Sequence, residues 1–499
     1  MLAACAKCKG PAREAQRLLD GGEGQPRLQA IEGLRTLLCA WVLVYQYLWS
    51  PAKASPAHWH ARHPNVASGE PHGLDAAVRT LSQRAYVAAD VFFVISGYVA
   101  HVWSGPEQLY GRKFVLKTVL RLAPAYYVAL VAVALVDHAM GTSYDFDPLE
   151  LLMVQTWLPF YGRSAAPATR RSALEPDAWN TPCWFVSAFF GVVVIHAAAH
   201  ALVLPKAAAA KARLTEVSQC LLRIVALCFL RMLPVLSISS NAVAVCEQNA
   251  KSAGQNAAAD AADARACDWQ FLPGAFSVFP PACYLIFAAG ALTARLVELT
   301  PPSVARLKAL LGVDVLIFAS AAMIVVRVPP DSMLARAQTF GLTLLSCVLL
   351  WRIGVAGQRA PATAGAENDA LLPDAGHARA EARTRGLCVR LLEHPALTAF
   401  GPWTFAVYAF HHPVAECFTD LRGWPRESPF TFFTFAFTLT ALSAAFTHCV
   451  QGPWERLVTR FMPEYHHPQW GDDSQPEEGC RADGPSARAQ AAAFKTVNI

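Results

Sequence analysis

Two adjacent histidines, His411 and His412, interrupt a long apolar segment of this chain. They lie in Pro395–Ala415, which contains no Asp, Glu, Lys or Arg. Ionisable groups at membrane depth are costly, so by default they mark a functional site. A histidine there could act as a general base. The competing interpretation is a neutral imidazole that hydrogen-bonds to a neighbouring helix, and both remain open at this point.

Arg35 and Gln46 form a second pair of polar residues, within the apolar segment Leu28–Trp49. A helix turns by about 100° per residue, so positions eleven apart return to within about 20° of one face. The two residues therefore share a face and lie roughly 16 Å apart along the helix axis. This spacing places a cation near one end of a span and an amide deeper in it.

A basic run, Arg112–Tyr127, leads into another apolar segment. Lys117 and Arg121 lie one turn apart in it, and Pro124 breaks the entry. Basic residues at a membrane surface often only fix topology. They can equally hold the phosphates of a nucleotide-bearing donor, because Lys and Arg bind phosphate well.

Ser96 lies beside Gly97 in the apolar block Val87–Trp103. Small residues let neighbouring helices approach closely, so the step is first interpreted as a packing notch. We also include the Ser96 hydroxyl among the candidate catalytic groups.

The composition predicts an all-α, polytopic membrane helix bundle. Of 499 residues, 54% are hydrophobic and 16% charged, against about 25% charged in soluble domains. About ten windows approach the length needed to cross the hydrocarbon. They are Thr36–Ala52, Val91–Pro106, Leu122–Val136, Ala178–Pro205, Leu221–Val245, Trp269–Ala294, Val315–Val326, Ala337–Trp351, Pro395–Ala415 and Ser428–Trp454. An eleventh, Leu149–Phe160, is too short and polar-flanked to be expected to cross.

The expected organisation is a polar tail (1–27), one membrane domain (28–460) with a disordered linker (358–386), and a second polar tail (461–499). With both termini in the cytoplasm, the segments on that side hold about twice as many basic residues as those opposite, as the positive-inside rule favours. The net charge of +5 therefore indicates membrane orientation, and we expect no nucleic-acid partner.

Patterns for a metal site are weak. Cys5 and Cys8 form a lone CxxC without a second ligand pair. Four histidines crowd one loop without acidic partners, and a solvated loop is the expected interpretation: His58, His60, His63 and His72. His196 and His200 share a helical face, but no HExxH pattern contains them, and we expect an interfacial position for them. We expect no metal.

Several blocks, taken in order, resemble the acyltransferase 3 family of multi-pass membrane proteins. That family includes bacterial O-acetyltransferases and nose-resistant-to-fluoxetine-like proteins. The resemblance covers about residues 28–460 and rests on the Trp184 segment and on six blocks: Ile31–Arg35, Asp90–Tyr98, Arg121–Tyr127, Tyr284–Leu292, Ala406–Pro413 and Gln451–Leu457.

The resemblance implies transfer of an acyl group, often acetyl, from acyl-CoA to a hydroxyl of a carbohydrate or other small acceptor. Acyl-CoA (acetyl-CoA), the acceptor and the lipid bilayer are then the expected partners. The implied donor-binding residues are Arg35, Lys117 and Arg121, and the candidate catalytic residues are Gln46, His411, His412 and Ser96.

The chain departs from the family at two positions. Gln46 stands where the family places an essential histidine, and a glutamine cannot take up a proton near neutral pH. Phe189 stands where sugar-modifying members tend to carry a glutamate. If the helices are neighbours, His411 or His412 could supply the base and Gln46 could orient the acceptor. The alternative is a catalytically impaired member that acts as a lipid or small-molecule carrier or as a binding protein.

Overall fold

The computed structural model describes eleven segments of the chain, namely residues 26–49, 86–108, 112–141, 148–157, 183–203, 215–232, 279–300, 312–326, 333–356, 386–424 and 428–461. Within these segments the fold is all-helical and no strand is present. Both predicted tails and the predicted linker lie almost entirely outside the described residues, so the predicted domain bounds stay a prediction.

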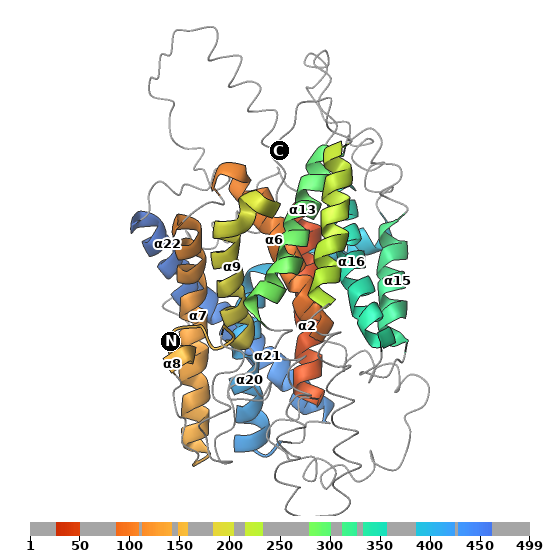
Figure 1. Ribbon diagram of the computed structural model, residues 1–499. Coiled ribbons are helices and arrows are strands. Elements are labelled where there is room, and N and C mark those ends of the chain that lie inside the picture. Colours follow the sequence, from red (N-terminus) through yellow and green to blue (C-terminus); the bar gives the residue numbers. More distant parts are fainter. Residues whose placement is uncertain are drawn as a thin grey trace, which may run out of the picture.

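Each of the ten predicted windows contains a helix in the described part of the chain (Figure 1). The helices are α2 (Pro26–Trp49), α6 (Tyr86–Gln108), α7 (Arg112–Ala139), α9 (Cys183–Val203), an unlabelled helix of residues 215–232, α13 (Pro280–Leu299), α15 (Val313–Val325), α16 (Met333–Ala356), α20 (Thr404–Glu416) and α21 (Pro429–Phe446). The shorter elements are α8 (Pro148–Leu151), α18 (Leu387–Leu392), α19 (Pro395–Thr398), η4 (Gly401–Trp403), η5 (Cys417–Leu421), η6 (Thr447–Gln451) and α22 (Gly452–Phe461).

Four stretches are long and apolar enough to cross a membrane: Phe114–Ala139, Pro280–Leu299, Ala337–Val355 and Pro429–Val458. Three shorter apolar helices accompany them, at Val87–Val102, Trp184–Ala199 and Val313–Ile324. The chain is therefore an integral membrane protein, and the number of about ten spans stays a prediction. The described part of Leu149–Phe160 holds only the end of α8 followed by turns.

Helices α6 and α13 pack in direct backbone contact in the core. A Cβ atom added at Gly97 would overlap the backbone carbonyl of Phe287, and one added at Gly290 would overlap that of Val94. Glycine on both sides lets the two backbones touch, the usual device for close packing of membrane helices. The packing role predicted for the Ser96–Gly97 step is confirmed at Gly97.

Helices α2 and α20 run side by side in the same direction. The Thr36 hydroxyl donates to the Leu397 carbonyl (2.9 Å), and the Cys39 thiol lies 3.6 Å from the Thr404 carbonyl. Because the partner position advances along the chain from the first contact to the second, the helices are parallel. Figure 1 shows α7 running the same way on the left of the bundle, with α22 beside its first turns. We call the end of the bundle where α7 begins the basic end.

The short helix α18 fixes the chain just before α20. The Asp314 carboxylate, at the start of α15, accepts hydrogen bonds from the backbone N–H groups of Leu387 (3.1 Å) and Cys388 (2.8 Å). Burial and this carboxylate raise the pKa of the Cys388 thiol to about 11, so the thiol stays protonated at neutral pH. The Leu392 carbonyl in turn packs directly over Gly33 of α2. These contacts tie the approach to α20 to two other helices.

Candidate functional site

His411 is buried in α20 with its two ring nitrogens in different environments. Its exposed fraction is 2%. Nδ1 lies 2.6 Å from the backbone carbonyl oxygen of Tyr408, one turn earlier. A carbonyl oxygen can only accept, so Nδ1 carries the proton and Nε2 carries the lone pair. Nε2 has no hydrogen-bond partner among the described residues. This is the tautomer that a general base requires.

His412 faces a buried carboxylate on the next turn. Its Nε2 lies 3.4 Å from Oε1 of Glu416, whose side chain is 1% exposed. A carboxylate beside an imidazole stabilises the imidazolium and fixes the ring orientation. Glu416 is not among the residues predicted from the sequence, although its spacing of four residues from His412 places both side chains on one helical face.

Gln46 and His411 lie at the same depth on neighbouring helices. The contact between Cys39 and Thr404 sets the register of α2 against α20. Gln46 follows Cys39 by seven residues, and His411 follows Thr404 by seven, so both lie about 10 Å beyond that contact. The side chain of Gln46 lies outside the described residues. The similar depth predicted for Gln46 and His411 therefore applies to their backbone positions.

Arg35 lies nearer the basic end and already has a carboxylate partner. Its Nη1 donates to both oxygens of Glu32, at 2.8 and 3.0 Å. Both side chains are partly exposed, at 27% and 21%. Glu32 itself packs against Gly401 in the turn before α20. The guanidinium is thus held in position while part of its donor set remains accessible to an anion.

Lys117 and Arg121 lie on α7, where the last family-like block docks. The Arg121 Nε lies 3.2 Å from Oε1 of Glu455, and Gln451 donates to the Arg121 carbonyl at 2.8 Å. The Arg121 side chain is 59% exposed. Lys117 is half-buried on the preceding turn. Both residues therefore lie in the part of α7 near the basic end, and their role in donor binding stays a prediction.

The break predicted at Pro124 is wrong, because α7 continues through this residue from Arg112 to Ala139. One contact in this region explains why the proline is tolerated there. A proline at this position has no N–H for the carbonyl four residues earlier, which is that of Leu120. The indole Nε1 of Trp454 donates to that same carbonyl at 2.6 Å. In a membrane helix such a freed carbonyl needs a new partner. The last family-like block supplies it from more than three hundred residues away.

Ser96 is partly buried on α6 beside the contact of Gly97 with α13. The described residues include no hydrogen bond of its hydroxyl that would activate it as a nucleophile. Its proposed catalytic role stays a prediction. The structure does not place Ser96 with the α20 histidines through any described contact.

Phe189, at the position where the resemblance implied a glutamate, belongs to an aromatic cluster. Its ring stacks on Phe185 at a centroid distance of 6.1 Å and an interplanar angle of 9°, and it lies near Phe93 and Phe287. The Phe185 ring also meets Tyr408 edge-on at 5.4 Å. The wall of the site on α9 is thus apolar at this position.

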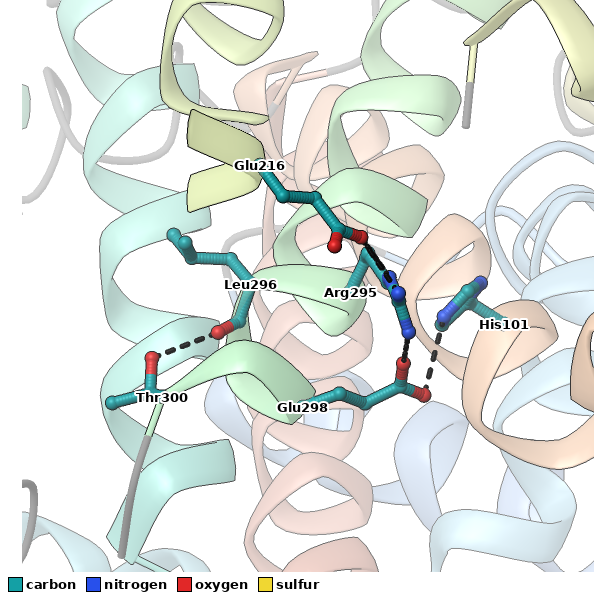
Figure 2. A network of polar contacts seen from close by, with 6 residues as sticks. All are labelled: His101, Glu216, Arg295, Leu296, Glu298 and Thr300. Atoms are coloured by element: carbon teal, nitrogen blue, oxygen red, sulfur yellow. Dashed lines mark hydrogen bonds and ion pairs between the residues drawn. The ribbon is translucent and has the colours of Figure 1, made fainter. Parts of the chain in front are cut away.

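A charged network that the sequence analysis did not predict joins three helices at their ends (Figure 2). Arg295 Nη2 donates to Oε1 of Glu216 at 2.6 Å, and its Nη1 donates to Oε2 of Glu298 at 2.7 Å. Nε2 of His101 lies 3.3 Å from Oε1 of Glu298. Glu216 is 4% exposed and Glu298 46%. The network connects α6, α13 and the helix of residues 215–232.

His196 is fully buried among the aromatic rings of Phe114, Tyr284 and Phe287. We expected an interfacial position, and the structure instead gives His196 a place in the helix packing. His200 and the four loop histidines have side chains outside the described residues. Within the described segments, no three His, Cys, Asp or Glu side chains gather as metal ligands. The absence of a metal stays a prediction.

Comparison with known proteins identifies a family model for most of the chain. The model, Acyl_transf_3, is described as an acyltransferase domain and matches residues 28–449. The matched range begins in α2 and ends in η6. No curated protein and no solved structure matches this chain.

Proposed function

This chain belongs to the acyltransferase 3 family, and from that premise we propose that it transfers an acyl group, acetyl foremost, from acyl-CoA to an acceptor hydroxyl. His411 is proposed as the general base. The observation that carries this proposal is its tautomer: Nδ1–H bonds to the Tyr408 carbonyl, and the lone pair of Nε2 is left free of described partners.

The proposed reaction balances within the site. Nε2 of His411 takes the proton of the acceptor hydroxyl, and the oxygen attacks the thioester carbonyl carbon. The tetrahedral intermediate collapses with cleavage of the C–S bond. The CoA thiolate leaves and recovers the proton from the imidazolium, which gives free CoA and an ester. Gln46, at the same depth, can orient the acceptor by hydrogen bonding but cannot act as the base.

The basic end is proposed as the entry side of the donor. Arg35, Lys117 and Arg121 lie there on two helices, and phosphate groups are the natural ligands of such cations. This end is proposed to face the cytoplasm, with both termini on the same side and about ten spans between them. The phosphates would then stay near the surface while the thioester reaches the depth of His411.

The test is release of free CoA from acetyl-CoA by the full-length protein in lipid nanodiscs, with an extract of hydroxylated acceptors. We expect His411→Asn to lower the rate by about 10²–10⁴-fold, because the amide can replace the Nδ1–H donor but offers no basic nitrogen. His448→Ala, an exposed histidine of η6, is the matched control and should change the rate less than about twofold.

A second variant tests the register of the two helices. Adding Gln46→His to His411→Asn should restore part of the lost rate, since it returns an imidazole to the same depth. Full activity of His411→Asn, or of the His411→Ala/His412→Ala double variant, would refute the assignment of the base. Binding of acetyl-CoA without turnover by the unchanged protein would favour the carrier or binding protein instead.

A further inference from the structure

The segment of residues 148–157 turns back into the bundle between α7 and α9. It follows the end of α7 that lies opposite the basic end. After α8, the backbone N–H of Met153 bonds to the Glu150 carbonyl (2.9 Å) and that of Val154 to the Leu149 carbonyl (2.8 Å). This pair of bonds closes a Schellman motif, whose left-handed position is usually a glycine. Here it is Met153, with φ of 56°.

Hydroxyl groups of the two flanking helices bind the polar backbone of this segment. The Tyr126 hydroxyl donates to the Glu150 carbonyl (2.6 Å), and the Tyr127 hydroxyl donates to the Leu151 carbonyl (2.7 Å). On α9, Ser187 accepts from the backbone N–H of Thr156 at 3.1 Å. Irregular backbone at membrane depth persists only where protein groups or a lined cavity satisfy it. A non-glycine residue held in the left-handed region is typical of functional sites.

The side chain of Gln155, near the end of this segment, has one oxygen atom, Oε1, without a hydrogen-bond partner among the described residues. Its side chain is 8% exposed. The Tyr126 hydroxyl donates its proton to the Glu150 carbonyl, so the Tyr126 oxygen can only accept from Gln155. The Gln155 atom 3.4 Å from that oxygen is therefore the donor Nε2. The other amide atom, Oε1, has no hydrogen-bond partner among the described residues. Buried acceptors without a partner are rare in native proteins, and they call for a ligand or an ordered water.

Contacts also connect Gln155, through Tyr126, to the helix that carries the proposed base. Gln451 bonds to the Arg121 carbonyl, which brings η6 and α7 to one level. From that level, Tyr126 lies five residues along α7, and Phe446 lies five residues back along the antiparallel α21. Both are therefore about 7 Å deeper. The Phe446 ring meets the ring of Phe410, the neighbour of His411, at a centroid distance of 5.0 Å.

We infer that Oε1 of Gln155 accepts a hydrogen bond from a hydroxyl of a polyhydroxylated acceptor, a second hydroxyl of which is acylated. The segment of residues 148–157 is then the acceptor-binding element, reached from the end opposite the basic end. This inference rests on the proposed function, because it uses the depth of His411 as the place of reaction. It adds a specificity-determining residue for the acceptor.

The test measures binding separately from turnover. Full-length protein in nanodiscs is titrated with D-glucose, N-acetylglucosamine and glycerol, and contact with the protein is followed by saturation-transfer NMR. Gln155→Met removes the acceptor oxygen while keeping an unbranched side chain. The matched control is Gln338→Met, because Gln338 is an equally buried glutamine on α16 whose amide donates to the carbonyls of Met323 and Val326.

We expect the unchanged protein to bind at least one of these probes and Gln155→Met to bind it about tenfold more weakly, the usual effect of one lost hydrogen bond. Gln338→Met should bind it normally. Tyr126→Phe, which frees the Gln155 amide, should weaken binding in the same direction. If Gln155→Met does not fold, this variant decides the question.

Equal binding by Gln155→Met and the unchanged protein, or no binding of any probe, would overturn the inference. A change in the KM for acetyl-CoA with an unchanged KM for the hydroxylated substrate would also overturn it, because Gln155 would then serve the donor. CoA release in the same samples separates the two proposals. Probe binding that depends on Gln155 but yields no CoA release would refute the transferase and leave the hydroxyl site standing.

Discussion

Replacing Trp454 by phenylalanine should destabilise the protein through a single backbone carbonyl. The indole Nε1–H is the donor that satisfies Leu120, whose carbonyl Pro124 leaves without its helical partner. Leaving a buried acceptor unsatisfied costs roughly 1–3 kcal/mol. Because the Leu120 and Trp454 side chains are only partly buried, we expect the loss in unfolding free energy near the lower half of that range.

A double-mutant cycle with Pro124→Ala tests the contribution of this hydrogen bond. Alanine restores an N–H at position 124, which can donate to Leu120 within the helix. In that background, Trp454→Phe should cost markedly less than in the unchanged protein. The coupling between the two positions, about 1 kcal/mol, isolates the hydrogen bond from the loss of ring area. Unfolding free energies are measured in mixed micelles by titration with SDS, with helicity as the readout.

Trp351→Phe is the matched control for this cycle. Its indole Nε1 donates to the Thr300 hydroxyl at 3.1 Å, a bond that does not involve Pro124. The loss in unfolding free energy caused by Trp351→Phe should therefore be the same with proline or alanine at position 124. Equal destabilisation by Trp454→Phe in both backgrounds would show that Trp454 stabilises the fold by packing alone. The hydrogen bond between the two family-like blocks would then contribute no measurable stability.

Two further stability predictions concern the core and the charged network. Gly97→Ala should cost about 1–3 kcal/mol by forcing α6 away from a backbone carbonyl of α13, as overpacking does. Gly341→Ala, which meets only a flexible methionine side chain, should cost less, and the same SDS titration compares them. Glu216→Ala should destabilise more than Glu298→Ala, because Glu216 is buried and water can replace the half-exposed partner of Arg295. Equal thermal midpoints for the two glutamate variants would contradict this ranking.

The helical content of the fold could be predicted because it depends on local composition. Long stretches without charge can satisfy their backbone groups in a membrane only as helices, so each window contains a helix. The close approach at Gly97 was also visible, since two small residues in an apolar helix favour packing. The helices and the packing at Gly97 can both be predicted without knowing which helices are neighbours.

The partners within the site could be predicted only where they share a helix. His411 and His412 stood out as ionisable groups in an apolar window, and the spacing of Glu416 from His412 was a usable signal. Glu216 and Arg295 are 79 residues apart, and no periodicity connects them. Gln155 lies in a segment that the sequence showed only as short and polar-flanked. Its environment depends on Tyr126, which a tertiary contact brings beside it.

The register of α2 against α20 determines what the substitution at position 46 means for catalysis. A base is useful only at the depth where the thioester and the acceptor hydroxyl meet. The contact between Cys39 and Thr404 places the backbone of position 46 and that of His411 at one depth, and contacts of Gln451 and Phe446 connect α7 to the helix of His411. The proposed replacement of the missing histidine by His411 therefore requires no shift of either substrate along the helix axis. For this reason His411, rather than Gln46, is the position at which the acyltransferase chemistry of this chain should be tested.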